Sequence, residues 1–96
     1  MGIDELLTAK REEIMRIAAQ HGARNIRVFG SIARGKADEQ SDIDFLVDME
    51  QGRSLLDMGG LLADLETLLQ RPVDVVTERG LKKRIRNRVL QDAVPL

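Results

Sequence analysis

The sequence contains no cysteine, no tyrosine and no tryptophan, and its aromatic residues are Phe29 and Phe45 alone. Without cysteine, a disulfide framework, a thiolate zinc site and a thiol nucleophile are excluded. Proteins that bind single-stranded nucleic acid usually stack bases on several aromatic rings, so direct nucleic-acid binding is not expected. No apolar run approaches a membrane span, and carboxylates interrupt the N-terminal segment where a signal peptide needs an apolar stretch. These absences favour a cytoplasmic protein that does not contact a membrane.

The length of 96 residues predicts one small domain over residues 1–96, with no room for a separate substrate-recognition domain. Residues 79–88 hold 6 of the 15 basic residues and no acid. The rest of the chain has 9 basic and 16 acidic side chains, a net charge of −7. The basic segment falls mostly in a C-terminal helix expected at about residues 81–93. Its face is open to three interpretations: a solvated surface, an RNA contact, or a docking surface for an acidic partner, which we favour.

Three stretches have the apolar periodicity of amphipathic helices. The first covers residues 3–20. The second begins at a capping box formed by Ser54 and Asp57 and runs to about residue 70. Its apolar stripe consists of Leu55, Met58, Leu62, Leu65 and Leu69. The third is the basic C-terminal helix, whose apolar positions are Leu81, Ile85, Val89 and Ala93. Gly59 and Gly60 weaken the second helix. We expect close packing on a sheet to explain them, and the alternative is a helix that begins after them.

Short β-prone segments alternate with these helices at residues 26–29, 43–47 and 73–76. A short helix is expected at residues 32–34, directly after the first strand, and a polar loop at residues 36–41. Asp48 and Glu50, near the far end of the second strand, are predicted to be surface charges. The predicted order is α-β-α-β-α-β-α. The fold class is therefore α/β, in its α+β form, with a mixed β-sheet backed by helices.

The most informative stretch covers residues 30–44 and reads GSIARGKADEQSDID. Gly30 permits a tight turn, and free backbone N–H groups together with the Ser31 hydroxyl can bind phosphate oxygens there. Taken alone, Gly-Ser is explained more simply as a turn that caps a helix. Asp42 and Asp44 are two residues apart, so in an extended segment both carboxylates point to the same side. Paired hard oxygen ligands suit Mg²⁺.

A third carboxylate strengthens the metal interpretation. Two like charges on a mostly apolar strand repel each other and resist burial, so they need solvent or a cation nearby. Asp74 is a lone acid in an apolar strand, where a carboxylate has no structural purpose. If the second and third strands are neighbours, Asp42, Asp44 and Asp74 converge on one site. Three acids beside a phosphate-binding turn indicate metal-assisted phosphoryl or nucleotidyl transfer.

The same residues resemble the signature of the DNA-polymerase-beta-like nucleotidyltransferase superfamily. The resemblance rests on Gly30-Ser31, Arg34-Gly35, Ser41 and the Asp42-Ile43-Asp44 triplet. More narrowly, the whole chain is similar to the minimal nucleotidyltransferases, the MntA-type antitoxins encoded beside HEPN-domain toxins in bacteria and archaea. Larger members of the superfamily carry an added helical domain that recognises the acceptor. This chain departs from them there, which leaves nucleotide choice and acceptor choice open.

The resemblance implies an antitoxin that transfers AMP from ATP to a tyrosine of a cognate HEPN ribonuclease toxin, within a toxin–antitoxin hetero-oligomer. It implies that Asp42 and Asp44 bind two Mg²⁺ ions, and that Asp74 completes one metal site and helps to deprotonate the attacking hydroxyl. The residues expected to bind the nucleotide are Gly30, Ser31, Arg34 and Ser41. Arg34 is equally well explained as a solvated side chain, and Ser41 as the cap of the turn before Asp42.

Because these 96 residues include no tyrosine, a tyrosyl acceptor must belong to another protein. Two alternatives stay open: a non-catalytic antitoxin that inhibits the HEPN toxin by complex formation, and a nucleotidyltransferase that acts on a small molecule or RNA. The three clustered acids favour an enzyme over a scaffold, because a scaffold does not need them. The nucleotide preference, the number of AMP units and the stoichiometry of a toxin complex are not encoded in any motif.

Overall fold

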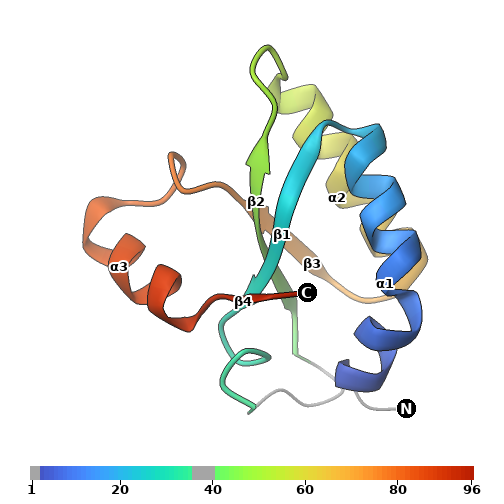
Figure 1. The fold of residues 1–96 in the computed structure, drawn as a ribbon, viewed down its shortest axis with the longest axis horizontal. Helices are drawn as coiled ribbons and strands as arrows, with labels where there is room; N and C mark the ends of the chain where they lie inside the picture. Colours follow the sequence, from blue (N-terminus) through green and yellow to red (C-terminus); the bar gives the residue numbers. More distant parts are fainter. Residues whose placement is uncertain (1–2, 36–40) are drawn as a thin grey trace.

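The computed structural model describes residues 3–35 and 41–96, and Figure 1 shows how their helices and strands are arranged. The helices are α1 (Ile3–Gln20), α2 (Leu55–Leu69) and α3 (Lys83–Asp92). The strands are β1 (Ala23–Phe29), β2 (Ile43–Met49), β3 (Val73–Val76) and β4 (Val94–Pro95). Within these described ranges, no helix is both long enough and apolar enough to span a bilayer.

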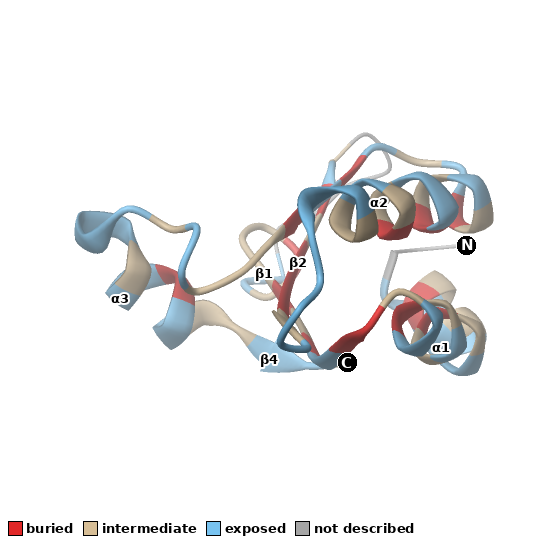
Figure 2. Cartoon of the chain, turned by 90° about the horizontal axis from the view of Figure 1, so that it is seen from above, coloured by how far each residue is buried: buried red, intermediate tan, exposed pale blue. Residues whose placement is uncertain are grey.

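The four strands form one mixed sheet in the order β3-β2-β1-β4. Strand β1 pairs antiparallel with β2 and with β4, whereas β2 and β3 run parallel. A parallel pair requires a crossover connection, which α2 provides. Helices α1 and α2 lie together on one side of the sheet, and α3 lies on the other side (Figure 2). The predicted α+β domain, a mixed sheet backed by helices, is confirmed.

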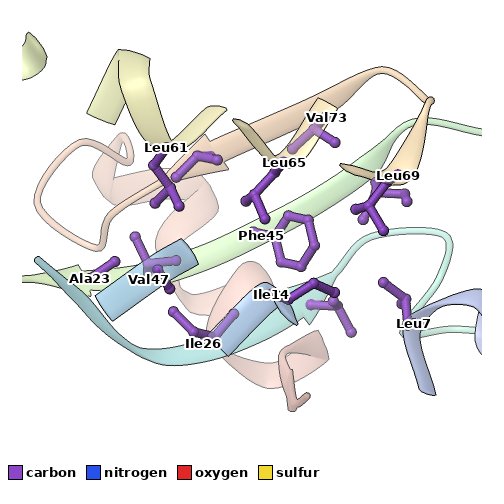
Figure 3. Close-up of a cluster of buried hydrophobic side chains, with 14 of the residues drawn as sticks. Leu7, Ile14, Ala23, Ile26, Phe45, Val47, Leu61, Leu65, Leu69 and Val73 are labelled. Atoms are coloured by element: carbon purple, nitrogen blue, oxygen red, sulfur yellow. The ribbon is translucent and has the colours of Figure 1, made fainter. Parts of the chain in front are cut away.

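The hydrophobic core lies between the sheet and the layer formed by α1 and α2. The alternate residues of β2 that belong to it are Ile43, Phe45 and Val47. They cluster with Ile14 of α1 and Leu65 of α2, and all five are at most 1% exposed. Figure 3 shows Phe45 and Val47 between these two helices. Asp44 and Asp48 alternate with the core residues along β2, so they face the opposite side of the sheet. The carboxylates of β2 therefore lie on the face that α1 and α2 leave uncovered.

Local hydrogen bonds fix both ends of α2. The Leu56 N–H donates to the Ser54 Oγ (3.2 Å), and the Ser54 N–H donates to the Asp57 Oδ2 (2.9 Å), which completes the predicted capping box. The hydrogen bond from the Ser54 backbone is the main cause that lowers the pKa of Asp57. At the other end, Gln70 adopts the left-handed conformation (φ 54°), and its N–H donates to the Glu66 carbonyl (2.8 Å). The predicted helix is confirmed at both ends.

The segment after β1 differs from its prediction. Residues 30–35 form consecutive turns, and the short helix expected at residues 32–34 is wrong. Gly30 (φ 75°) and Gly35 (φ 70°) lie at the two ends of the segment in conformations outside the helical range, so a helix cannot extend in either direction. The loop predicted at residues 36–41 lies, except for Ser41, outside the described residues.

Two apolar stripes also differ from their predictions. Leu55 begins the predicted stripe of α2 but is 84% exposed, because the buried side of this helix is formed by Leu61, Leu65 and Leu69 instead. In α3, Val89 is buried, whereas Ile85 is 41% exposed. Strand β4 was not predicted from the sequence, because two residues are too few to show the alternation of a strand.

Gly60 has a different structural reason from the one expected. A β-carbon at this position would lie 2.8 Å from Cε1 of His21, at the end of α1, rather than against the sheet. His21 is held in place because its Nε2 lies 2.6 Å from the Asp64 Oδ2, one turn further along α2. At Gly59, by contrast, no atom of the described residues lies within 4 Å of where a β-carbon would be. Of the two glycines, Gly60 is therefore the one that allows α1 and α2 to approach.

We predict opposite effects of alanine at these two glycines. Gly59→Ala is expected to raise the free energy of unfolding by about 0.5–1 kcal/mol, because alanine favours the helix. Gly60→Ala is expected to lower it by about 1 kcal/mol, because the new methyl group displaces His21 from Asp64 and outweighs the same helical gain. Urea denaturation of both variants measures the two effects. If Gly60→Ala is as stable as Gly59→Ala, the packing argument is contradicted. Adding His21→Ala to both variants should remove the difference between their free energies of unfolding.

Candidate active site

Strand register brings two of the predicted acids together. Asp44 of β2 is the direct partner of Asp74 in the parallel ladder with β3. On its other side, Asp44 is the partner of Phe29, the last residue of β1. Side chains at directly paired positions point to the same face of a sheet. Asp44 and Asp74 therefore lie side by side on the face opposite α1 and α2, and the strand adjacency on which their convergence depends is confirmed.

The turn after β1 lies directly against Asp44. Gly30 follows Phe29, and a β-carbon at Gly30 would lie 2.7 Å from the Asp44 Oδ2. The Arg34 N–H closes the turn by donating to the Gly30 carbonyl (3.1 Å), and Ile32 anchors it in the core at 6% exposure. The predicted phosphate-binding turn therefore lies next to Asp44, one of the two predicted metal-binding acids, although the two are distant in the sequence.

The electrostatics of the site are unfavourable for the protein alone. Burial, followed by the negative charges of Asp74 and Asp42, raises the pKa of Asp44 above its ordinary value. Asp42 and Asp74 are exposed, and Asp44 is partly buried between Phe29 and Asp74. A cation bound among the three carboxylates would remove the repulsion, because it supplies the missing positive charge. The raised pKa of Asp44 shows that its charge is a cost to the folded protein.

The donor set fits Mg²⁺ in its chemistry, because all three side chains offer hard carboxylate oxygens. Within residues 3–35 and 41–96, however, no three or more carboxylate, imidazole or thiolate side chains are already grouped closely enough to hold a metal ion. The assignment of Asp42, Asp44 and Asp74 as metal ligands stays a prediction.

The remaining predicted nucleotide-binding residues have partners within the protein. Arg34 is half exposed, and its Nη1 lies 3.6 Å from the Asp92 Oδ2 at the end of α3. The carbonyl of Ser41 accepts a hydrogen bond from the Arg71 Nη2 (3.0 Å). Ser31 is partly buried in the turn beside Gly30. Roles of these three residues in nucleotide binding stay predictions. Arg71 and Asp92 could not be identified from the sequence, because each contacts a segment that is distant along the chain.

Asp48, four residues beyond Asp44 on the same face of β2, has a structural partner. Its Oδ1 lies 3.1 Å from the Arg27 Nη2, and the Arg27 Nη1 lies 3.3 Å from the Glu78 Oε1. The Arg27 side chain is only 13% exposed. At the end of β2, residues Met49, Glu50, Arg53 and Leu55 help to line a hollow of about 870 Å³. Neither Asp44 nor Asp74 lines that hollow, so the acids lie on a separate part of the surface.

The comparison with known proteins decides the family. Residues 11–96 match the nucleotidyltransferase domain family. The chain belongs to this family. The nucleotidyltransferase is 44% identical to the protein adenylyltransferase MntA of Thermococcus cleftensis over 96% of this chain and 90% of that protein. It is also 38% identical, over 98% of its length and 97% of the relative, to a Methanocaldococcus jannaschii protein assigned as a protein adenylyltransferase.

Solved structures agree with this result. The nucleotidyltransferase superimposes on a solved minimal nucleotidyltransferase with a TM-score of 0.85 and 53% identity, covering 96% of this chain and 94% of the other. A toxin–antitoxin structure with AMP-PNP has the same fold, with a TM-score of 0.74 and 22% identity over 88% of this chain and 69% of that one. The expected fold family and the expected enzyme class, a nucleotidyltransferase, are both confirmed.

Proposed function

We propose that this nucleotidyltransferase is an antitoxin that transfers AMP from ATP to a tyrosine hydroxyl of a cognate HEPN ribonuclease toxin. The observation that carries the proposal is the contact between Gly30 and Asp44, because it joins a phosphate-binding turn to a pair of carboxylates. The 44% identity to the protein adenylyltransferase MntA supports a protein acceptor. The absence of tyrosine from the chain requires that a tyrosyl acceptor come from a partner.

In this proposal, the turn at Gly30 and Ser31 holds the phosphates of ATP, and Arg34 adds a positive charge at their edge. The tyrosyl oxygen forms a bond to the α-phosphorus, and the bond from that phosphorus to the bridging oxygen of the β-phosphate breaks. Pyrophosphate leaves, and the hydroxyl proton passes to the exposed carboxylate of Asp74. Mg²⁺ held by Asp42, Asp44 and Asp74 would neutralise the charge that develops on the phosphates.

The test is to incubate the chain with ATP, Mg²⁺ and the protein encoded by its neighbouring gene, and then to weigh that protein by intact mass spectrometry. We expect mass to increase in units of AMP, and the increase to vanish with the Asp42→Ala/Asp44→Ala variant or when Mg²⁺ is chelated. Peptide mapping should place the added AMP on a tyrosine. A complex that neutralises the toxin without any mass change would show a non-catalytic antitoxin instead, and transfer to RNA or a small molecule would refute the protein acceptor.

A further inference from the structure

Asp42 is the predicted metal ligand that the sheet itself does not hold. It lies one residue before β2 and is exposed, whereas Asp44 and Asp74 belong to paired strands. A carboxylate that must share an ion with its neighbours has to be positioned to within a fraction of an ångström. Another part of the fold must therefore fix the backbone around Asp42.

The turn between α2 and β3 contacts the backbone on both sides of Asp42. Before it, the Arg71 Nη2 donates to the Ser41 carbonyl (3.0 Å). After it, the Ile43 N–H donates to the Pro72 carbonyl (3.0 Å). The Ser41 carbonyl belongs to the planar peptide unit that ends in the Asp42 nitrogen, so holding this oxygen fixes the plane from which Asp42 extends. Two adjacent residues thus hold the backbone on either side of Asp42.

The turn that carries Arg71 is well suited to this task. Gln70 before it is in the left-handed conformation and is bonded to Glu66, and Pro72 after it has a fixed φ angle. Arg71 itself is partly buried, so its long side chain has little freedom. The same turn leads directly into β3, which carries Asp74 two residues after Pro72. One rigid connection therefore relates the positions of two of the three acids.

We propose that Arg71 is a positioning residue for the active site, which holds the Ser41-Asp42 peptide so that the Asp42 carboxylate faces Asp44 and Asp74. This inference rests on the proposed function only for its catalytic consequence. Arg71 does not contact the substrate; it acts through the Ser41 carbonyl. Lysine at this position can donate one hydrogen bond to that carbonyl but lacks the planar guanidinium, so it should replace arginine only in part.

The test compares Arg71→Met, Arg71→Lys and a matched control, Arg53→Met. Arg53 pairs with Glu50 and Asp57 beyond the far end of β2, so its replacement removes the same charge away from the acids. For Arg71→Met we expect kcat for AMP transfer to fall about 10–100-fold with little change in the KM for ATP. Mn²⁺ affinity, measured by electron paramagnetic resonance, should fall about 10–100-fold. Arg71→Lys should recover part of both losses, and Arg53→Met should show neither.

A third measurement is independent of catalysis. Amide hydrogen exchange at Asp42 and Ile43 should become faster in Arg71→Met but not in Arg53→Met, because only Arg71→Met removes the hydrogen bond to the Ser41 carbonyl. If Arg71→Met changes neither the amide exchange nor the Mn²⁺ affinity, the inference is overturned. It is also overturned if Arg71→Met and Arg53→Met lose activity and Mn²⁺ affinity equally, in proportion to their melting temperatures. If the wild-type chain transfers no AMP while exchange responds as expected, the proposed function fails and the positioning role of Arg71 stands.

Discussion

Asp44→Asn is expected to lower AMP transfer by about 10³-fold, which corresponds to about 4 kcal/mol of transition-state stabilisation. Asparagine has nearly the same shape as aspartate, so the contacts with Gly30 and the pairing with Asp74 are kept. The change removes the central negative charge of the site and, in the proposed function, one metal ligand. Initial rates of AMP incorporation into the partner protein measure the effect, and a loss of less than tenfold would contradict a central role for this carboxylate.

The same variant is expected to be more stable than the wild type. Burial and the charges of Asp74 and Asp42 raise the pKa of Asp44 above the value of 3.8 expected in the unfolded chain. The folded state then binds protons more readily than the unfolded state, so ionising Asp44 lowers the free energy of unfolding. This cost is fully present above the raised pKa, decreases as the pH falls through it, and disappears below 3.8. Asparagine avoids the cost, so its advantage in urea denaturation should be present at about pH 7 and absent at about pH 3.

Asp48→Asn provides the control, because Asp48 lies on the same strand and the same face as Asp44. Asp48 is paired with Arg27 (3.1 Å) and accepts a hydrogen bond from the Asn25 side chain (3.0 Å). Its replacement should lower the free energy of unfolding by up to about 1 kcal/mol and leave AMP transfer unchanged. The two variants should therefore change the free energy of unfolding in opposite directions, and only Asp44→Asn should lower AMP transfer. If the two variants changed AMP transfer and the free energy of unfolding equally, both effects would come from the total charge on this face of the sheet and not from Asp44 itself.

The parts of the fold that the sequence predicted correctly are those determined by local interactions. The bounds of β3 and of α1 match their predictions, and α2 begins at the capping box formed by Ser54 and Asp57. These elements are defined by residues that are neighbours along the chain. The short helix at residues 32–34 was wrong: Gly30 and Gly35, both at positive φ, bound a stretch that is too short for a stable helix, and it forms turns instead.

Long-range contacts account for what the sequence left open. The alternation of β2 predicted that Asp42 and Asp44 share a face, but only the observed register places Asp74 beside Asp44. Nothing local indicates that Arg71 reaches Ser41, 30 residues earlier in the chain, or that His21 requires a glycine on α2. Such contacts depend on how whole elements dock, and side-chain periodicity carries no information about docking. The candidate site residues could therefore be named from the sequence, whereas the interactions that hold them could not.

Gly30→Ala is expected to lower AMP transfer by about 10²-fold although the protein remains folded. Alanine at this position has two distinct effects. The left-handed backbone (φ 75°) costs about 1 kcal/mol of stability with any β-carbon. The methyl group also lies 2.7 Å from the Asp44 Oδ2, so the carboxylate must rotate away. Rotating a short side chain costs little stability, but it moves a group whose position the chemistry requires.

Gly35→Ala separates the two effects, because Gly35 has nearly the same backbone conformation (φ 70°) and no atom of the described residues lies within 4 Å of a β-carbon there. Both variants should lose about 1 kcal/mol in urea denaturation, whereas only Gly30→Ala should lose activity. Adding Gly30→Ala to the Asp44→Ala variant isolates the contact. Without the carboxylate, Gly30→Ala should cause a smaller further loss of AMP transfer than it causes in the wild type. If Gly35→Ala reduces AMP transfer as strongly as Gly30→Ala, the loss comes from the backbone of the turn and not from Asp44. If only Gly30→Ala does, the loss comes from the displacement of the Asp44 carboxylate by the new methyl group.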